Sequence, residues 1–356
     1  MKSLKLQRGM SLVELLVALA IGAFLIIGAV TVQSQTRKTF SVNEQQARLQ
    51  ETARFVLSVI EPDVQLAGLY GFSNIPDGVR MSVDGNIQYA SDMRTNKEAI
   101  EGMPAVLDAC GANQVVDVTA PIQADDGGWP MAEGCDASGG GHIAGTDTLT
   151  VRRSSVNKVD AAKGRIQLYT NRLAREDQVL FMDGVAPGPL KDDEKEIRDL
   201  IMQMYYVSPD SEGRPNLPSL RLKRISNDAG EAGAWDDQEV VRGVEDIQIE
   251  LGVDPGEDRN VDTFPDDIAG DGMSDFVNGV VARYVKPSAA ILSSGQVVAV
   301  RIWVRVRAEE PEAGFKDNRV YNYGSVANFK PADGYRRVVM SRTIFLRNSR
   351  AFPSSS

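Results

Sequence analysis

The chain has 356 residues, of which 42% are hydrophobic and 25% charged, the composition of an ordinary globular protein. This composition excludes a disordered, a collagen-like and a polytopic membrane protein, and the length predicts two folding units at about 150 residues each. The net charge of −10 comes without a basic patch of the kind that binds nucleic acids, so we expect no nucleic-acid partner.

The first predicted element is a long apolar helix behind a short basic leader. Lys2, Lys5 and Arg8 precede it, and the 22 residues from Leu15 to Thr36 contain no charge. As an α-helix this run extends about 33 Å, enough for the hydrocarbon core of a bilayer. A secretory signal peptide would have a shorter apolar stretch and a small-residue cleavage site after it, so a membrane anchor fits better.

A simple anchor leaves Glu14 unexplained. A carboxylate inside an apolar helix costs about 2.5–3.5 kcal/mol on insertion scales and usually has a partner. In a static anchor the Glu14 side chain would instead extend to the membrane surface.

Residues 8–18 resemble the class III signal of type IV pilins and of type II secretion pseudopilins: Arg8, a glycine, four mostly apolar residues, Glu14 and a long apolar run. The resemblance implies that a prepilin peptidase cuts between Gly9 and Met10 and methylates the new N-terminus at Met10. Glu14 would then lie beside the Met10 amine of a neighbouring subunit, where each charge neutralises the other. The chain departs from the family at Met10, where most members have Phe, and at Thr31, where many major pilins have Pro.

The helical pattern continues beyond the apolar run. Apolar residues recur along one side of a helix, at Val42, Leu49, Ala53, Val56 and Ile60, with polar residues between them. This amphipathic pattern predicts that the second part of the helix packs on a globular domain. We expect the helix to cover 10–61, to kink or end at Pro62 and to stop firmly at Gly68.

Strand patterns follow residue 68. Apolar residues occupy every even position of 300–307 and every odd position of 247–253, which indicates half-buried strands. Further strands are expected at Thr148–Arg152, Ile166–Thr170, Val179–Met182, Ile201–Val207, Leu220–Ile225 and Val338–Leu346, with a hairpin connection at Pro209–Pro215. The predicted fold class is α+β, a type IV pilin-like long N-terminal helix packed on an antiparallel β-sheet domain with long loops.

The expected organisation has four segments. Residues 1–9 are the leader peptide, 10–36 the transmembrane or filament-core half of the helix, 37–67 its amphipathic half, and 68–356 a β-rich globular domain. Within that domain, residues 71–145 and 254–296 are rich in Gly, Pro, Asp and Ser and are expected to form long loops.

The second loop is acidic, and hard oxygen ligands at this density suit calcium. Asp254, Asp258, Asp271 and Asp275 are the candidate ligands. Their spacing does not fit an EF-hand, and a solvated acidic loop without metal is the favoured interpretation. No cofactor is otherwise expected.

The two cysteines, Cys110 and Cys135, are expected to form one disulfide in an oxidising compartment, with two buried thiols as the alternative. The single histidine, His142, follows three glycines and is interpreted as a solvated loop residue. The sequence contains no nucleophile elbow, phosphate-binding loop or zinc-protease motif, so we expect no enzyme.

Three further stretches, 145–152, 241–253 and 342–348, resemble the PilW subgroup of minor pilins. The resemblance implies a non-catalytic structural subunit of a type IV pilus that helps prime assembly in a minor-pilin tip complex. Its partners would be other minor pilins, the major pilin, the prepilin peptidase and the inner-membrane assembly platform. The chain would cross the inner membrane once, with a periplasmic C-terminal domain, and would later become extracellular near the pilus tip.

Two alternatives stay open. A J-type minor pseudopilin of type II secretion shares the signal and the helix, although its globular domain is usually shorter. A membrane-tethered, adhesin-like binding module would use the long loops as its contact surface and would need neither Gly9 nor Glu14.

Overall fold

The computed structural model describes residues 11–72, 79–83, 86–88, 118, 120–131, 135–172, 178–186, 195–225, 235–254, 280–293 and 296–348. The chain divides into two compact units, Met1–Arg48 and Leu49–Ser356, and the second unit is called the β domain below. One long helix and mostly antiparallel sheets confirm the predicted α+β class.

The elements are, in chain order, α1 (Leu12–Leu66), β1 (Val79–Val83), β2 (Asn86–Gln88), β3 (Ile122–Asp125), β4 (Thr148–Ser154), β5 (Lys163–Asn171), β6 (Gln178–Asp183), β7 (Lys195–Ser208), β8 (Ser219–Ile225), β9 (Trp235–Arg242), β10 (Val244–Asp254), β11 (Arg283–Val285), the 3-10 helix η2 (Ala290–Ser293), β12 (Gln296–Arg307), β13 (Tyr321–Tyr323), β14 (Val326–Phe329) and β15 (Arg337–Phe345). Every strand expected from the sequence is present, and the connection between β7 and β8 is the expected hairpin.

The helix α1 continues past Pro62 to Leu66, so Pro62 does not end it. Asp63 and Val64 are buried in the β domain, and these contacts hold the last turn although proline removes one helical hydrogen bond. The stop at Gly68 is confirmed. Its φ of +75° is the left-handed conformation that ends many helices, and the Leu69 N–H donates to the Leu66 carbonyl at 3.0 Å.

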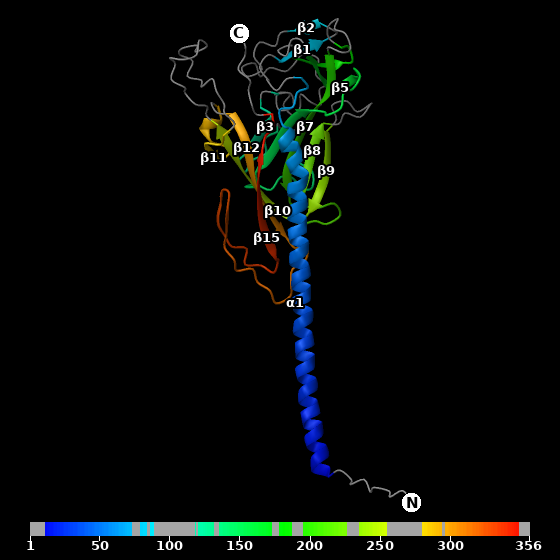
Figure 1. The fold of residues 1–356 in the computed structure, drawn as a ribbon, viewed down its shortest axis with the longest axis vertical. Coiled ribbons are helices and arrows are strands. Elements are labelled where there is room, and N and C mark those ends of the chain that lie inside the picture. The colour runs from blue at the N-terminus through cyan, green and yellow to red at the C-terminus, as the bar shows by residue number, and fades with distance from the viewer. Residues whose placement is uncertain are drawn as a thin grey trace, which may run out of the picture. The chain divides into compact units, whose positions relative to one another are not determined.

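The described strands of the β domain form two main sheets (Figure 1). The larger sheet has the order β2-β1-β6-β5-β7-β4-β3, with β8 paired to β7 and β9 to β8, and the smaller has the order β11-β10-β12-β15. The strands β13 and β14 form a separate hairpin. All these pairs are antiparallel except β1 with β6, which is parallel.

The main core lies where the last turns of α1 meet both sheets (Figure 1). Leu57, Ile60 and Val64 are among its least exposed members. In β12, Val300, Ile302, Val304 and Val306 face this core, as the period-2 pattern predicts. Ile247, Ile249 and Leu251 of β10 join it in the same way. The even face of β10 is also buried, because the segment that carries β13 and β14 lies over it: Tyr323 contacts Asp246 and Ser325 contacts Gln248. The expectation of a half-buried β10 is therefore wrong.

Two regions differ further from the sequence expectation. The strand β9 was not predicted, since its residues Trp235–Arg242 are mostly polar; cross-strand ion pairs with β8 hold it, such as Arg221 with Asp237 at 2.9 Å. The two expected loops contain short strands, β1 to β3 in the first and β11 in the second, whose backbones pair with longer strands.

Asp147 joins the two sheets at the start of β4. Its N–H donates to the Ile247 carbonyl at 2.9 Å, and its carboxylate accepts the N–H groups of Ile249 at 2.7 Å and Gly127 at 3.1 Å. The residue is 1% exposed. Burial raises the pKa of Asp147 from 3.8 to about 7, against the effect of these hydrogen bonds. The stability of the β domain is therefore expected to depend on pH through Asp147.

We expect the free energy of unfolding to depend on Asp147 between about pH 4 and pH 7. In this window the native state binds the proton and the unfolded state does not, so stability falls as pH rises, by up to about 1 kcal/mol per pH unit from this residue. Urea unfolding of the full chain in detergent at pH 5 and pH 8 measures the slope. Asp147→Asn should reduce it, whereas the exposed Asp160→Asn should leave it unchanged. An unchanged slope in Asp147→Asn would contradict this role.

Candidate functional site: the N-terminal helix and its attachment to the β domain

The start of α1 is closed by Ser11 and Glu14. The Glu14 N–H donates to the Ser11 hydroxyl at 3.2 Å, and the Ser11 N–H donates to the Glu14 carboxylate at 3.4 Å. This reciprocal pair is a capping box, which satisfies two N–H groups that a helix start otherwise leaves free. Glu14 thus has a local structural partner that the sequence reading missed, although the Ser-x-x-Glu spacing is its signature. Gly9 and Met10 lie outside the described residues, and their roles stay predictions.

The helix that follows is apolar on all sides. Leu12, Phe24 and Leu25 are 65–78% exposed in the single chain, and α1 contains a stretch that is long and apolar enough to cross a membrane. The hydroxyls of Thr31 and Thr36 donate to the carbonyls four residues earlier, at 2.8 and 2.9 Å. These two hydroxyls are therefore satisfied within the helix. Glu14 is the only charged residue between Ser11 and Thr36.

The last turns of α1 belong to the β domain. Leu49, Ala53, Val56 and Ile60, four of the five residues of the predicted apolar side, are buried in its core. Val42, the fifth, lies in the N-terminal unit. The sequence therefore identifies the packed side of the helix correctly for the part within the β domain.

A buried charged residue, Asp63, fixes the end of α1 on the larger sheet. Its carboxylate accepts two hydrogen bonds from Arg153 of β4, at 2.9 and 3.2 Å, and one from the Tyr205 hydroxyl of β7 at 2.5 Å. Burial, with the adjacent Asp63 carboxylate, raises the pKa of Tyr205 and keeps its hydroxyl a donor. The sequence reading missed this contact, although Asp63 follows Ile60 by three residues and therefore falls on the apolar side.

The same end of α1 is attached to the last strand. Glu61 forms an ion pair with Arg342 of β15, and the Arg347 N–H donates to the Gln65 carbonyl at 3.2 Å. The Asn348 side-chain amide lies 3.4 Å from the Ala67 carbonyl. The end of the helix is thus bonded to both sheets.

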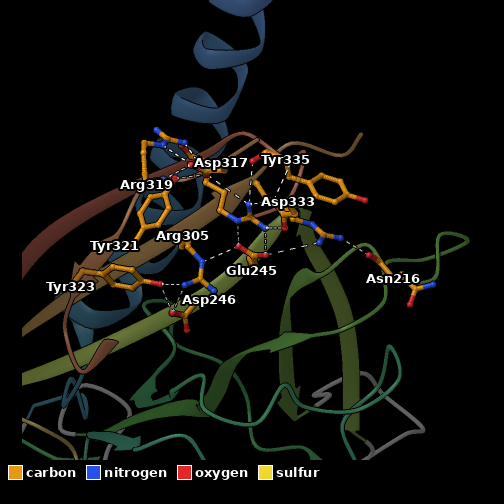
Figure 2. Close-up of polar contacts among 12 residues, drawn as sticks. Asn216, Glu245, Asp246, Arg305, Asp317, Arg319, Tyr321, Tyr323, Asp333 and Tyr335 are labelled. Carbon is orange, nitrogen blue, oxygen red and sulfur yellow. Dashed lines mark hydrogen bonds and ion pairs between the residues drawn. The ribbon is translucent and has the colours of Figure 1, made fainter. Parts of the chain in front are cut away.

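A second polar cluster lies within the smaller sheet and is centred on Glu245 of β10 (Figure 2). Glu245 accepts hydrogen bonds from Arg305 of β12 at 2.9 Å and from Arg337 of β15 at 2.7 and 2.9 Å. Burial opposes the ionisation of Glu245, but the Arg337 hydrogen bonds and the arginine charges outweigh it and hold its pKa below the usual value. One carboxylate therefore joins three neighbouring strands.

The cluster extends to the segment 309–336, which covers the outer face of the sheet. Asp333 accepts from Arg337 at 2.6 Å, and Asp317, which is almost fully buried, pairs with Arg319 at 2.9 Å (Figure 2). The Tyr323 hydroxyl donates to Asp246 at 2.5 Å. With Arg307, four arginines face four carboxylates, so the charges of the cluster balance, and its chemistry is that of a structural clamp.

The remaining sequence candidates are not brought together by the described residues. Asp254 is buried at the end of β10, and Asp258, Asp271 and Asp275 lie outside the described residues. Within the described part of the chain, no group of three His, Cys, Asp or Glu residues could hold a metal ion. Cys135 is buried and Cys110 lies outside the described residues, so their disulfide stays a prediction.

His142 is not a solvated loop residue. It is half-buried, its Nε2 lies 3.0 Å from the Thr146 carbonyl, and its ring lies 5.8 Å from that of Trp129. Burial lowers its pKa. These contacts are those of a structural residue, which connects the end of the glycine run to Thr146 and Trp129.

Comparison with known families matches two parts of the chain. Residues 204–348 match the family model of the Type IV Pilus-assembly protein W, PilW, and residues 4–30 match the prokaryotic N-terminal methylation motif. The two matches together support a PilW-like, type IV pilus-related pilin. No curated protein and no solved structure matches it.

The two matches coincide with the structural features above. The methylation motif covers Glu14 and most of the apolar part of α1, and the PilW match runs from β7 to the residues that follow β15. The PilW region therefore includes the whole cluster around Glu245 and the β15 end of the contacts with α1. The PilW match suggests a structural protein and implies pilus components as partners.

We expect Asp63→Ala to destabilise the β domain by about 3 kcal/mol, because it leaves the partly buried Arg153 without its counter-ion and the buried Tyr205 hydroxyl without its acceptor. Thermal or urea unfolding of the full chain in detergent measures the loss. The control is Glu51→Ala, an exposed glutamate on the same helix, which should change stability by less than about 0.5 kcal/mol. Equal effects of the two substitutions would show that Asp63 does not hold the helix.

We expect Glu245→Gln to cost about 3 kcal/mol, because the amide keeps the shape but removes the charge between Arg305 and Arg337. Glu309→Gln removes an exposed partner of Arg214 instead and should cost no more than about 1 kcal/mol. The urea midpoints of unfolding of the two variants, compared with that of the unsubstituted protein, measure the two losses of stability. A Glu245→Gln protein as stable as Glu309→Gln would exclude the clamp.

Proposed function

We propose that this pilin is a non-catalytic minor subunit of a type IV pilus that helps prime pilus assembly within a minor-pilin tip complex. The observation that carries the proposal is the combination of a methylation motif around Glu14 with a PilW region in the β domain. The apolar part of α1 retains the subunit in the inner membrane before assembly and forms part of the filament core afterwards.

Processing prepares the subunit for this exchange. Cleavage between Gly9 and Met10 creates a cationic amine at Met10, which methylation leaves positively charged. Glu14 of one subunit then pairs with Met10 of its neighbour, and each charge removes the desolvation cost of the other. The helix leaves lipid for a bundle of equal apolarity, so the charge pair rather than the hydrophobic effect directs the exchange.

The β domain supplies the contacts with other subunits. It is periplasmic while the helix is in the membrane and extracellular after incorporation. Its partners are other minor pilins and the major pilin, with the prepilin peptidase and the inner-membrane platform acting before incorporation. The attachment of α1 through Asp63 supports this assignment, because a subunit drawn out of a membrane by its domain needs a firm connection between the two.

The mass of the N-terminal peptide, measured on protein from sheared pili and from inner membranes, tests processing and location together. We expect an N-methylated peptide that begins at Met10 in both fractions. An intact Met1 would refute processing by a prepilin peptidase. Processed protein that never appears in sheared pili, and appears with secretion machinery instead, would favour the pseudopilin.

We expect both Glu14→Ala and Glu14→Gln to reduce incorporation into pili at least about tenfold, the equivalent of about 1.4 kcal/mol, while membrane insertion is unchanged. Glutamine keeps the acceptor of the capping box but not the charge, so it separates the two roles of Glu14. Immunoblots of sheared pili and of membranes measure both effects. Normal incorporation of Glu14→Gln would show that Glu14 acts only as a cap.

A further inference from the structure

The strand β15 ends the smaller sheet, and its backbone geometry shows which groups point away from the sheet. The Leu346 N–H donates to the Val298 carbonyl at 3.0 Å, and the Arg336 carbonyl accepts the Ala308 N–H at 2.8 Å. Even-numbered residues of β15 therefore bond to β12. Because N–H and C=O of one residue in an antiparallel strand point to the same side, the odd-numbered residues direct theirs to the outer edge.

The outward N–H and C=O groups of β15 form a row along the edge of the sheet. At both ends of this row they have hydrogen-bond partners, and between the ends they have none within the described chain. The Arg337 carbonyl accepts a hydrogen bond from Arg319 at 3.1 Å, and the Arg347 N–H donates to the Gln65 carbonyl of α1. Between these residues, four have no backbone partner within the described chain: Val339, Ser341, Thr343 and Phe345. Ser341 and Thr343 are exposed, and Phe345 is 58% exposed.

The row also lacks the features that usually protect a sheet edge. Natural edge strands carry charged side chains, proline or bulges that prevent the addition of another strand. The edge strand β9 of the larger sheet follows this rule, with charged residues at half its positions. The two arginines of β15, Arg337 and Arg342, are paired with Glu245 and Glu61. The four outward residues are uncharged, and the pairing of β15 with β12 has no register shift.

We propose that this edge, Val339–Phe345, binds an extended acidic segment of another pilus subunit as an added β-strand. The proposal rests on the proposed function, since it requires neighbours in a pilus. Only an extended backbone satisfies a row of alternating N–H and C=O groups, and added strands gain their affinity from these bonds.

The charge of the strand defines the partner further. Residues 334–348 contain four arginines and no acidic residue, in a chain whose net charge is −10. Arg347 is exposed at the end of the row. Arg336, Arg337 and Arg342 are already paired with Glu312, Glu245 and Glu61, so among the described residues Arg347 is the arginine of this stretch that an acidic segment can pair with. A second copy fits less well, since its own residues 334–348 contain no acidic side chain that could pair with Arg347.

Substitutions at Ser341 test the proposal in the full chain. Ser341→Pro removes one outward N–H, which edge strands tolerate, and should reduce recovery in sheared pili about tenfold without loss of the folded domain. Ser341→Glu should reduce recovery similarly through repulsion of an acidic segment, whereas Ser341→Lys should not. The exposed Gln238 of β9, changed to Glu or Lys, is the matched control and should have no effect.

A photoreactive residue at Ser341 identifies the occupant. A cross-link to an acidic extended segment of another pilus subunit supports the proposal, and a cross-link to a second copy or to this chain itself overturns it. Full recovery of both Ser341→Pro and Ser341→Glu also overturns it. If the unchanged chain itself is never found in pili, the proposed function fails, which is a different result from normal recovery of the variants.

Discussion

The β domain depends on the burial of one side of α1 between two sheets. Leu57, Ile60 and Val64 are almost completely buried in a cluster that includes residues of both sheets. Each such side chain contributes about 1.5–3 kcal/mol relative to exposure, so neither sheet has a complete core without the helix. Apolar contacts alone tolerate a slip along the helix. The contacts of Asp63 do not tolerate such a slip, because a shift of one turn would leave its buried carboxylate and the partly buried Arg153 guanidinium unpaired.

In the smaller sheet, too, charged side chains fix the position of one part of the chain on another. Its inner face is apolar and packs on the core, whereas its outer face carries Glu245, Asp246 and Arg305 under the segment 309–336. Charges in that position cost stability unless each has a partner, and here arginines and carboxylates balance. The cluster therefore fixes where the covering segment lies, a task that a non-directional apolar contact performs poorly.

The sequence predicted most of the fold where one periodicity dominated. Alternation located β10 and β12, and the apolar side of the helix located the residues that pack in the core. Prediction failed where partners distant in sequence decided the outcome. The strand β9 has no apolar period and is held by Arg221 and Lys223 of β8. The helix passes Pro62 because Asp63 and Val64 are bound by strands far along the chain. The Glu14 cap could be predicted from its spacing with Ser11. The polar cluster could not, since the two arginines that donate to Glu245 lie 60 and 92 residues away in the sequence.

The proposed function gives Glu14 two partners that act at different stages, and their energies differ in kind. In the single chain the carboxylate accepts the Ser11 N–H and closes the helix, which contributes about 1 kcal/mol whether or not the surroundings are apolar. That bond leaves most of the lone pairs of the carboxylate unsatisfied, so the cost of the charge in lipid persists. No residue from Leu15 to Thr36 can neutralise it. A neighbouring subunit with a cationic N-terminus can, and the remaining cost then becomes a driving force for lateral association of the helices. A helix with a neutral residue at this position would enter the membrane more readily, and it would lack this driving force for leaving the membrane.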